Sequence, residues 1–304
     1  MKRSCATRAT TDRRLARRVR QYAQGWATER RYLEVSKHRT ERCKQIAWRH
    51  GILLSEVGST LHGVSDGSTG DDLDLMGICF EPPQTAIGLE KFEQFEGRWH
   101  KDGTPIPDGT RSGAGDTDLT SYSLRKWARL AADGNPTVQL ILFSPENKVY
   151  HQNRYGRMLR EAANLFISKE SGSRYLGYLR SQVQLMLGLR SGHTNRPELV
   201  ETYGVDLKAG YHACRLGIQG IQLMREGYVS LPMRDCDREP LIALRRGEYG
   251  RDSQRWVLDY LAVLEDELKR SIDQSHLPDH PDRVLIDNFL ANAHLEYWEE
   301  AQLV

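Results

Sequence analysis

A glycine-serine pair and two alternating aspartates are the residues of this sequence whose types and spacing best suit chemistry. Gly58 and Ser59 follow an apolar run, and Asp72 and Asp74 begin another, with twelve residues between Ser59 and Asp72. A glycine lets the backbone approach a phosphate closely, and the serine hydroxyl and neighbouring N–H groups can bind phosphate oxygens. The pair therefore predicts a phosphate-binding turn.

The two aspartates predict a cation site. On a strand, residues two apart point to the same side, so Asp72 and Asp74 should project together while Leu73 and Leu75 face the core. Two carboxylates side by side repel each other, and a hard divalent cation such as Mg²⁺ relieves that repulsion. The alternative is a pair of solvated acids at a strand end.

Short apolar runs bounded by Gly, Asp and Pro predict the elements that must position these residues. Strands are expected at 51–57, 72–80 and 118–122, and a long polar loop, 97–115, should join the second to the third. A helix should run from Ser123 to Gly134, where Pro136 fixes its end.

Beyond residue 155 nearly all of the chain has helical periodicity. Helices are expected at 156–168, 174–190, 206–227, 239–246, 253–273 and 281–301. The expected fold class is α+β: a small mixed β-sheet domain with flanking helices at 46–155, then an α-helical C-terminal domain at 156–304.

The helix at 206–227 should carry a cationic stripe. Lys208, His212 and Arg215 lie at i, i+4 and i+7, so they share one face. The opposite side carries the apolar residues Leu207, Cys214, Ile218 and Ile221. The stripe could reach phosphates across a cleft between the two halves, or it could be a solvated, salt-bridged surface.

Composition excludes several classes of protein. The 304 residues are 39% hydrophobic and 28% charged, which is typical of a soluble globular chain of about two domains. No apolar run reaches the roughly 20 residues of a membrane span, and no secretory signal is evident, so a cytoplasmic protein without a membrane partner is expected. Five scattered cysteines without a CxxC pair indicate free thiols.

The net charge of +2 conceals two opposed segments. The first fifty residues hold 15 basic and 4 acidic side chains, a charge of +11, and the remainder carries −9. Leu15, Val19, Tyr22 and Trp26 recur at helical spacing among arginines, so residues 1–45 are predicted as a basic amphipathic helical extension. It could bind RNA, dock on the domain with a solvated cationic face, or be an organellar transit peptide.

These motifs together resemble a known superfamily. The Gly58-Ser59 turn before the Asp72-Leu-Asp74 strand resembles the DNA polymerase beta-like nucleotidyltransferases. The runs 118–130, 134–136, 142–145, 208–216 and 244–249 are similar to one branch, the phage and bacterial RNA repair pathway DNA polymerase beta family. The resemblance covers about residues 51–295.

The resemblance implies roles for individual residues. Asp72 and Asp74 would be ligands of two Mg²⁺ ions, with Mn²⁺ as a substitute, and Asp118, in preference to Asp116, would be the third acid. Gly58 and Ser59 would hold the triphosphate of an NTP. Lys208 and His212 would also bind the nucleotide.

Three other polar residues near these motifs remain open. His62 departs from the family pattern, which has an aromatic residue at its position, and it could contact the nucleotide or be incidental. Arg125 and Lys126 follow Asp118 and could neutralise phosphates or form an ordinary helix-surface pair.

The implied reaction is transfer of a nucleoside monophosphate from an NTP to a hydroxyl, with an RNA 3′ end as the expected acceptor. One alternative is AMP transfer to a protein hydroxyl, as in toxin-antitoxin systems. Another is an inactive, RNA-binding protein on a transferase scaffold. The base, the acceptor and the oligomeric state are not predicted by the sequence.

Overall fold

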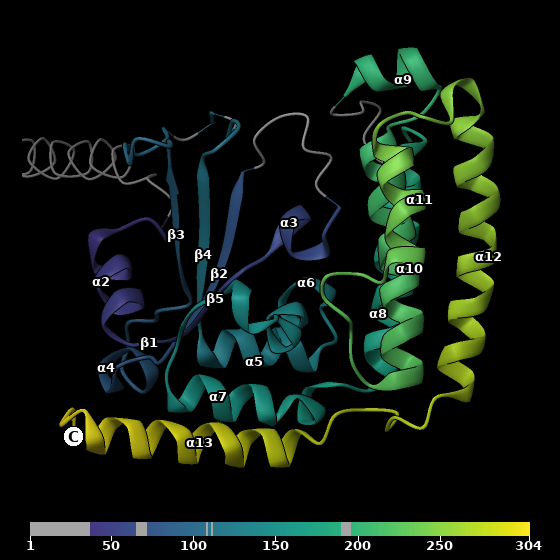
Figure 1. Cartoon of the computed structure of the whole chain (residues 1–304). Coiled ribbons are helices and arrows are strands. Elements are labelled where there is room, and N and C mark those ends of the chain that lie inside the picture. Colours follow the sequence, from purple (N-terminus) through teal and green to yellow (C-terminus); the bar gives the residue numbers. More distant parts are fainter. Residues whose placement is uncertain (1–36, 65–71, 108, 111, 190–195) are drawn as a thin grey trace, which may run out of the picture.

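The computed structural model describes residues 37–64, 72–107, 109–110, 112–189 and 196–304 (Figure 1). Most of the predicted basic extension therefore lies outside the described residues. The first described element is helix α2 (Glu41–Arg49), which the Thr40 side chain caps by accepting a hydrogen bond from the Cys43 N–H.

The chain forms a five-stranded mixed sheet in the order β3-β4-β2-β1-β5, which confirms the predicted fold class. The strands are β1 (Gly51–Glu56), β2 (Leu73–Cys79), β3 (Gln94–Trp99), β4 (Thr117–Ser123) and β5 (Val149–Gln152). The β2–β4 pair is parallel and the other pairs are antiparallel. The three strands expected from sequence are β1, β2 and β4.

The two edge strands were not predicted. The first part of the expected polar loop is in fact the end of β3. Glycine and charged residues interrupt the alternation of apolar and polar residues by which this strand could be recognised. Gly97 is needed there because a Cβ at this position would lie 2.1 Å from the Trp99 ring, which packs across it. Strand β5 is only four residues long and largely exposed, so it gives little alternation to detect.

Helices cover both faces of the sheet. Helices α5 (Leu124–Ala132), α7 (Arg154–Glu161) and α13 (Arg283–Glu300) bury one face around Ile78, Phe80 and Trp127. Helix α2 lies on the other face, over Phe95 and Leu119. Leu75 packs against the core on the α2 side, as expected, whereas Asp74 shares its face with the buried Ile78, so there is a core on each face of the sheet.

The C-terminal half has a hydrophobic core of its own. Its helices are α8 (Lys169–Met186), α9 (Pro197–Tyr203), α10 (Leu207–Glu226), α11 (Asp235–Arg245) and α12 (Ser253–Gln274). Helix α10 is central, and it packs closely on its neighbours at two glycines. A Cβ at Gly217 would lie 3.0 Å from Leu264, and one at Gly220 would lie 2.9 Å from Tyr175.

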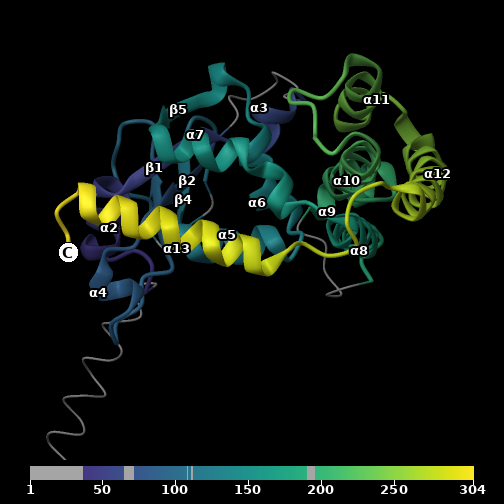
Figure 2. The ribbon, with the colours of Figure 1, turned by 90° about the horizontal axis from the view of Figure 1, so that it is seen from below.

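The last helix returns to the sheet (Figure 2). Helix α13 runs across the sheet half beside α5 and α7, away from the bundle of α8, α10, α11 and α12. Tyr297 stacks on Phe80 with ring centroids 4.2 Å apart, and Trp298 Nε1 donates a hydrogen bond to Glu81 O at 2.8 Å. The predicted domain division at residue 155 stays a prediction.

Two further expectations concern the whole chain. In the described ranges no helix has both the length and the apolar character that a membrane span requires. The four described cysteines, Cys43, Cys79, Cys214 and Cys236, are free thiols, as predicted.

Candidate functional site

The predicted glycine-serine turn lies directly against one of the predicted aspartates. Strand β1 ends at Glu56, and the short helix α3 (Gly58–His62) follows, with Ser59 in its first turn. Gly58 has a φ of +79°, and a Cβ on it would lie 2.2 Å from Asp74 Oδ2. Only glycine fits this position, because the Asp74 carboxylate occupies the space that a side chain would need.

Two of the three predicted carboxylates come from neighbouring strands. Asp74 of β2 and Asp118 of β4 are partners in the parallel register, which puts their Cα atoms about 4.8 Å apart. Residues in register on adjacent strands point to the same face. Asp72 lies immediately before β2, and all three aspartates are partly exposed.

An arginine and a serine hold the Asp118 carboxylate. Arg98 of β3 is the register partner of Asp118, and its Nε donates to Asp118 Oδ1 at 3.2 Å. Ser112 Oγ donates to the same oxygen at 2.7 Å, and Arg98 Nη1 donates to Thr110 O at 2.7 Å. The connection between β3 and β4 is thereby tied to this carboxylate.

Asp116, the competing candidate for the third acid, has a different environment. Its Oδ2 accepts the Gly113 N–H at 2.7 Å, and its Oδ1 lies 3.3 Å from His100 Nδ1. The Gly113 hydrogen bond, opposed by desolvation and supported by His100, lowers the pKa of Asp116. This carboxylate shapes the loop, whereas Asp118 is the one in register with Asp74.

Lys208 of α10 is electrostatically coupled to two of the aspartates. Its side chain reaches solvent, yet partial burial lowers the pKa of Lys208, with the charges of Arg196 and Arg245 acting in the same direction. The carboxylates of Asp72 and Asp74 oppose that shift, which shows that they lie within electrostatic range of the Lys208 ammonium.

His212 lies one turn further along α10. Burial lowers the pKa of His212 well below its usual value, and the charges of Arg215, Lys208, Arg245 and Arg196 add to the shift. The imidazole is therefore neutral at pH 7. Of the predicted cationic stripe, Lys208 and Arg215 are charged and His212 is neutral, and we call these three residues the α10 wall. Arg245 of α11 and Arg196, before α9, add positive charge near it.

His62 has a structural role. Its side chain is only 4% exposed, and its Nδ1 lies 3.0 Å from Gln219 Nε2, which donates to it, on α10. Burial, together with the charges of Arg215 and His212, lowers the pKa of His62 well below its usual value. The histidine therefore joins α3 to the helical half, and nucleotide contact by its ring is not compatible with this burial.

The donor set suits a hard divalent cation. Within the described ranges, no three His, Cys, Asp or Glu side chains are already gathered as ligands of one ion. Asp74 and Asp118 nevertheless project from adjacent register positions, and Gly58 leaves space for the Asp74 carboxylate. Carboxylate oxygens are the ligands that Mg²⁺ prefers.

Sequence reasoning missed the residues that support this site. Arg98 was hidden in the expected loop, and its pairing with Asp118 depends on a strand that was not predicted. Arg245, whose Nη1 donates to Val64 O at 2.6 Å, is far from α10 in sequence. Arg125 and Lys126 belong elsewhere, because they lie beyond the opposite end of β4 and pair with Glu81 and Glu93.

Comparison with known proteins finds one family whose model matches this chain. The family model for the RNA repair pathway DNA polymerase beta family matches residues 35–292. A solved structure, that of a nucleotidyltransferase-like protein from Exiguobacterium sibiricum 255-15, is 12% identical with a TM-score of 0.28, over 77% of this chain and 72% of that one. A similarity this low says nothing about individual residues. No curated protein matches the chain.

Substitution of Gly58 tests its contact with Asp74. Gly103→Ala is the matched control, because Gly103 has a φ of +84° and a Cβ added there would have no other atom within 4 Å. We expect Gly103→Ala to cost about 1–2 kcal/mol through backbone strain alone. Gly58→Ala should cost more in urea unfolding, because Asp74 must also move. Equal costs would contradict the contact.

The pH dependence of stability tests the buried histidines. His62 and His212 have lowered pKa values in the folded protein, so below pH 6.5 only the unfolded state takes up their protons. The free energy of unfolding should therefore fall as the pH drops from 6.5, by about 1.4 kcal/mol per pH unit for each histidine. His62→Gln should reduce this slope in urea titrations, whereas the exposed His276→Gln should leave it unchanged. An unchanged slope in His62→Gln would contradict the assignment.

Proposed function

The chain belongs to the RNA repair pathway DNA polymerase beta family, and from this premise we propose that it transfers a nucleoside monophosphate from an NTP to an RNA 3′ hydroxyl. The observation that carries the proposal is the pairing of Asp74 with Asp118, with Gly58 packed against Asp74. This arrangement puts a turn whose backbone can approach a phosphate beside two carboxylates that can hold a cation. A triphosphate bound with its cation requires both features.

In this proposal Asp72, Asp74 and Asp118 hold Mg²⁺, for which Mn²⁺ can substitute. Bound divalent cations would neutralise phosphate charge and favour ionisation of the acceptor hydroxyl. Arg98 and Ser112 fix one oxygen of Asp118, so that its carboxylate keeps a defined orientation. Positioning and charge neutralisation supply most of the catalysis in phosphoryl transfer.

The triphosphate would lie between α3 and the α10 wall. Gly58 and Ser59 would donate backbone and hydroxyl hydrogen bonds from one side, and Lys208 would supply a positive charge from the other. His212, which is neutral at pH 7, would act as a hydrogen-bond donor and not as a counter-charge. The electrostatic coupling of Lys208 to Asp72 and Asp74 supports this placement.

The chemical step conserves atoms and charge. The acceptor oxygen attacks the α-phosphorus, a new phosphorus-oxygen bond forms, and the bond to the bridging oxygen breaks. Pyrophosphate leaves with that electron pair, and Asp118 accepts the hydroxyl proton. Gly58, Ser59 and Lys208, which would bind the triphosphate, would hold these atoms in line.

Two observations support RNA as the acceptor. The family is described as part of an RNA repair pathway. The first fifty residues carry a charge of +11, and clustered cations bind nucleic acid by displacing counterions from phosphates. The basic segment would thus add to the affinity of the chain for RNA.

Replacing each aspartate by asparagine, which has the same shape but no charge, tests the role of the carboxylates. Asp74→Asn and Asp118→Asn should each lower Mg²⁺-dependent transfer of labelled nucleotide to RNA by at least about a hundredfold, because each removes a charge needed in the transition state. Asp116→Asn is the matched control, two residues away in the loop, and should retain most of the activity. The measurement is label incorporation with each NTP, resolved on a gel.

The same gel separates the alternative reactions. Label in RNA supports the proposal, and label in the protein's own chain indicates transfer to protein hydroxyls. No label with any NTP indicates an inactive scaffold. A loss in Asp116→Asn as large as that in Asp118→Asn would overturn the assignment of the third acid.

A further inference from the structure

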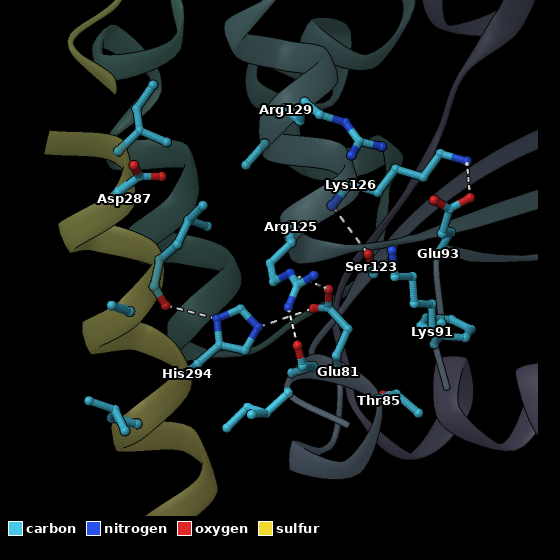
Figure 3. Close-up of a pocket in the computed structure, with 18 of the residues that line it drawn as sticks. Glu81, Thr85, Lys91, Glu93, Ser123, Arg125, Lys126, Arg129, Asp287 and His294 are labelled. Carbon is cyan, nitrogen blue, oxygen red and sulfur yellow. Dashed lines mark hydrogen bonds and ion pairs between the residues drawn. The ribbon is translucent and has the colours of Figure 1, made fainter. Parts of the chain in front are cut away.

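A second polar cavity lies at the far end of the sheet from the carboxylates. It has a volume of about 690 Å³ and lies between α5, α13 and the segment that contains α4 (Pro83–Ala86) (Figure 3). Ser123, which lines it, is five residues beyond Asp118 on β4, about 16 Å along the strand. The cavity is therefore separate from the proposed transfer site, and its volume is that of a small-molecule site.

The lining of this cavity has an excess of positive charge. Its basic residues are Lys91, Arg125, Lys126, Arg129 and Arg283, and its acidic residues are Glu81, Glu93 and Asp287. Figure 3 shows Lys91, Lys126 and Arg129 along one side, opposite His294 and Asp287 of α13.

Most of these cations are already neutralised. Arg125 pairs with Glu81 at 3.5 Å and Lys126 with Glu93 at 3.7 Å. Arg283 pairs at 2.8 Å with Asp133, which is not part of the lining. Lys91 and Arg129 have no ion-pair partner among the described residues, and the carboxylate of Asp287 offsets part of their charge, so the lining keeps a small positive excess.

The positive end of a helix adds to this charge. Ser123 caps α5, its Oγ accepting the Lys126 N–H at 3.2 Å, and it lines the cavity. A helix N-terminus favours an anion, and here it acts beside the two unpaired cations. Together these features favour an anion with several acceptor oxygens, such as a phosphate monoester, on the side of the cavity that holds Lys91 and Arg129.

The lining of the cavity also includes exposed apolar side chains. Ile87, after α4, is 78% exposed, and Leu295 of α13 is 59% exposed. Phe92 also lines the cavity and is almost fully buried. Two large apolar side chains that are open to solvent in the lining of one cavity suit a ligand with an apolar or aromatic body.

Buried polar contacts fix the walls of the cavity. Glu81 is 1% exposed, and its Oε2 lies 3.1 Å from His294 Nε2. His294 Nδ1 donates to Leu290 O at 2.8 Å, and Trp298 Nε1 donates to Glu81 O at 2.8 Å. These bonds join α13 to the segment that follows β2. Buried hydrogen bonds therefore fix the position of the elements that line the cavity.

We infer that this cavity binds a phosphate monoester attached to an apolar or aromatic body, which is the chemistry of a nucleoside monophosphate. Lys91, Arg129 and the N-terminus of α5 would bind the phosphate, and Ile87 and Leu295 would cover the body. The ligand could be a free nucleotide or the 5′-phosphorylated end of an RNA strand. The inference does not depend on the proposed transfer reaction.

The test is calorimetric titration of the full chain in EDTA, so that no transfer occurs. The probes are AMP, inorganic phosphate, and one decaribonucleotide with and without a 5′-phosphate. Lys91→Ala/Arg129→Ala should weaken binding about tenfold or more, because charge-assisted hydrogen bonds to the phosphate are lost. Arg157→Ala, which removes an exposed cation on α7 outside the cavity, should leave binding unchanged.

Each outcome is decisive. Binding of AMP identifies a free nucleotide as a source, and binding of only the 5′-phosphorylated strand identifies a strand end. Hydrogen exchange should slow in 83–93 and 283–298 on binding. Three results would overturn the inference: no binding of either ligand, binding that the double variant does not weaken, or inorganic phosphate binding as tightly as AMP. Because Lys91 and Arg129 are exposed, unchanged thermal unfolding should show that the double variant folds.

Discussion

Two carboxylates held at adjacent positions of a parallel strand pair repel each other, and the surrounding structure keeps the two residues side by side. The hydrogen bonds between β2 and β4 fix Asp74 and Asp118 in register. Gly58 leaves room for Asp74, while Arg98 supplies a positive charge beside Asp118. The sheet is buried on both faces, so its strands cannot separate to relieve the repulsion. Such a pair has high affinity for positive charge, which is the property that a triphosphate-cation complex requires.

Helix α3 connects the turn beside Asp74 to the helical half. Although α3 has only five residues, Leu61 on it and Val64 after it are buried in the core formed around α10. Gln219 binds His62, and the Met233 N–H donates to His62 O at 3.1 Å. The turn that touches Asp74 and the α10 wall that carries Lys208 are therefore parts of one packed unit. A change in the angle between the halves would move both sides of the candidate site together.

Local pattern was sufficient to predict the central elements, whereas long-range pairing was not predictable. Strands β1 and β2 have clear apolar runs ended by Gly or Asp, and helical spacing alone put Lys208 and His212 on one face. The edge strands β3 and β5 lack such runs, and with β3 the Arg98 contact to Asp118 was missed. Helix α13 has apolar residues around most of its circumference, and only the tertiary structure shows that it packs on the sheet.

The most direct test of the paired carboxylates is Mn²⁺ binding, measured from the loss of the free-ion EPR signal during titration of the full chain. The structure predicts saturable binding by the wild-type protein that is strongly weakened in both Asp74→Asn and Asp118→Asn and is retained in Asp116→Asn, since only the first two lie in register. Binding that is unchanged in both Asp74→Asn and Asp118→Asn would contradict the account.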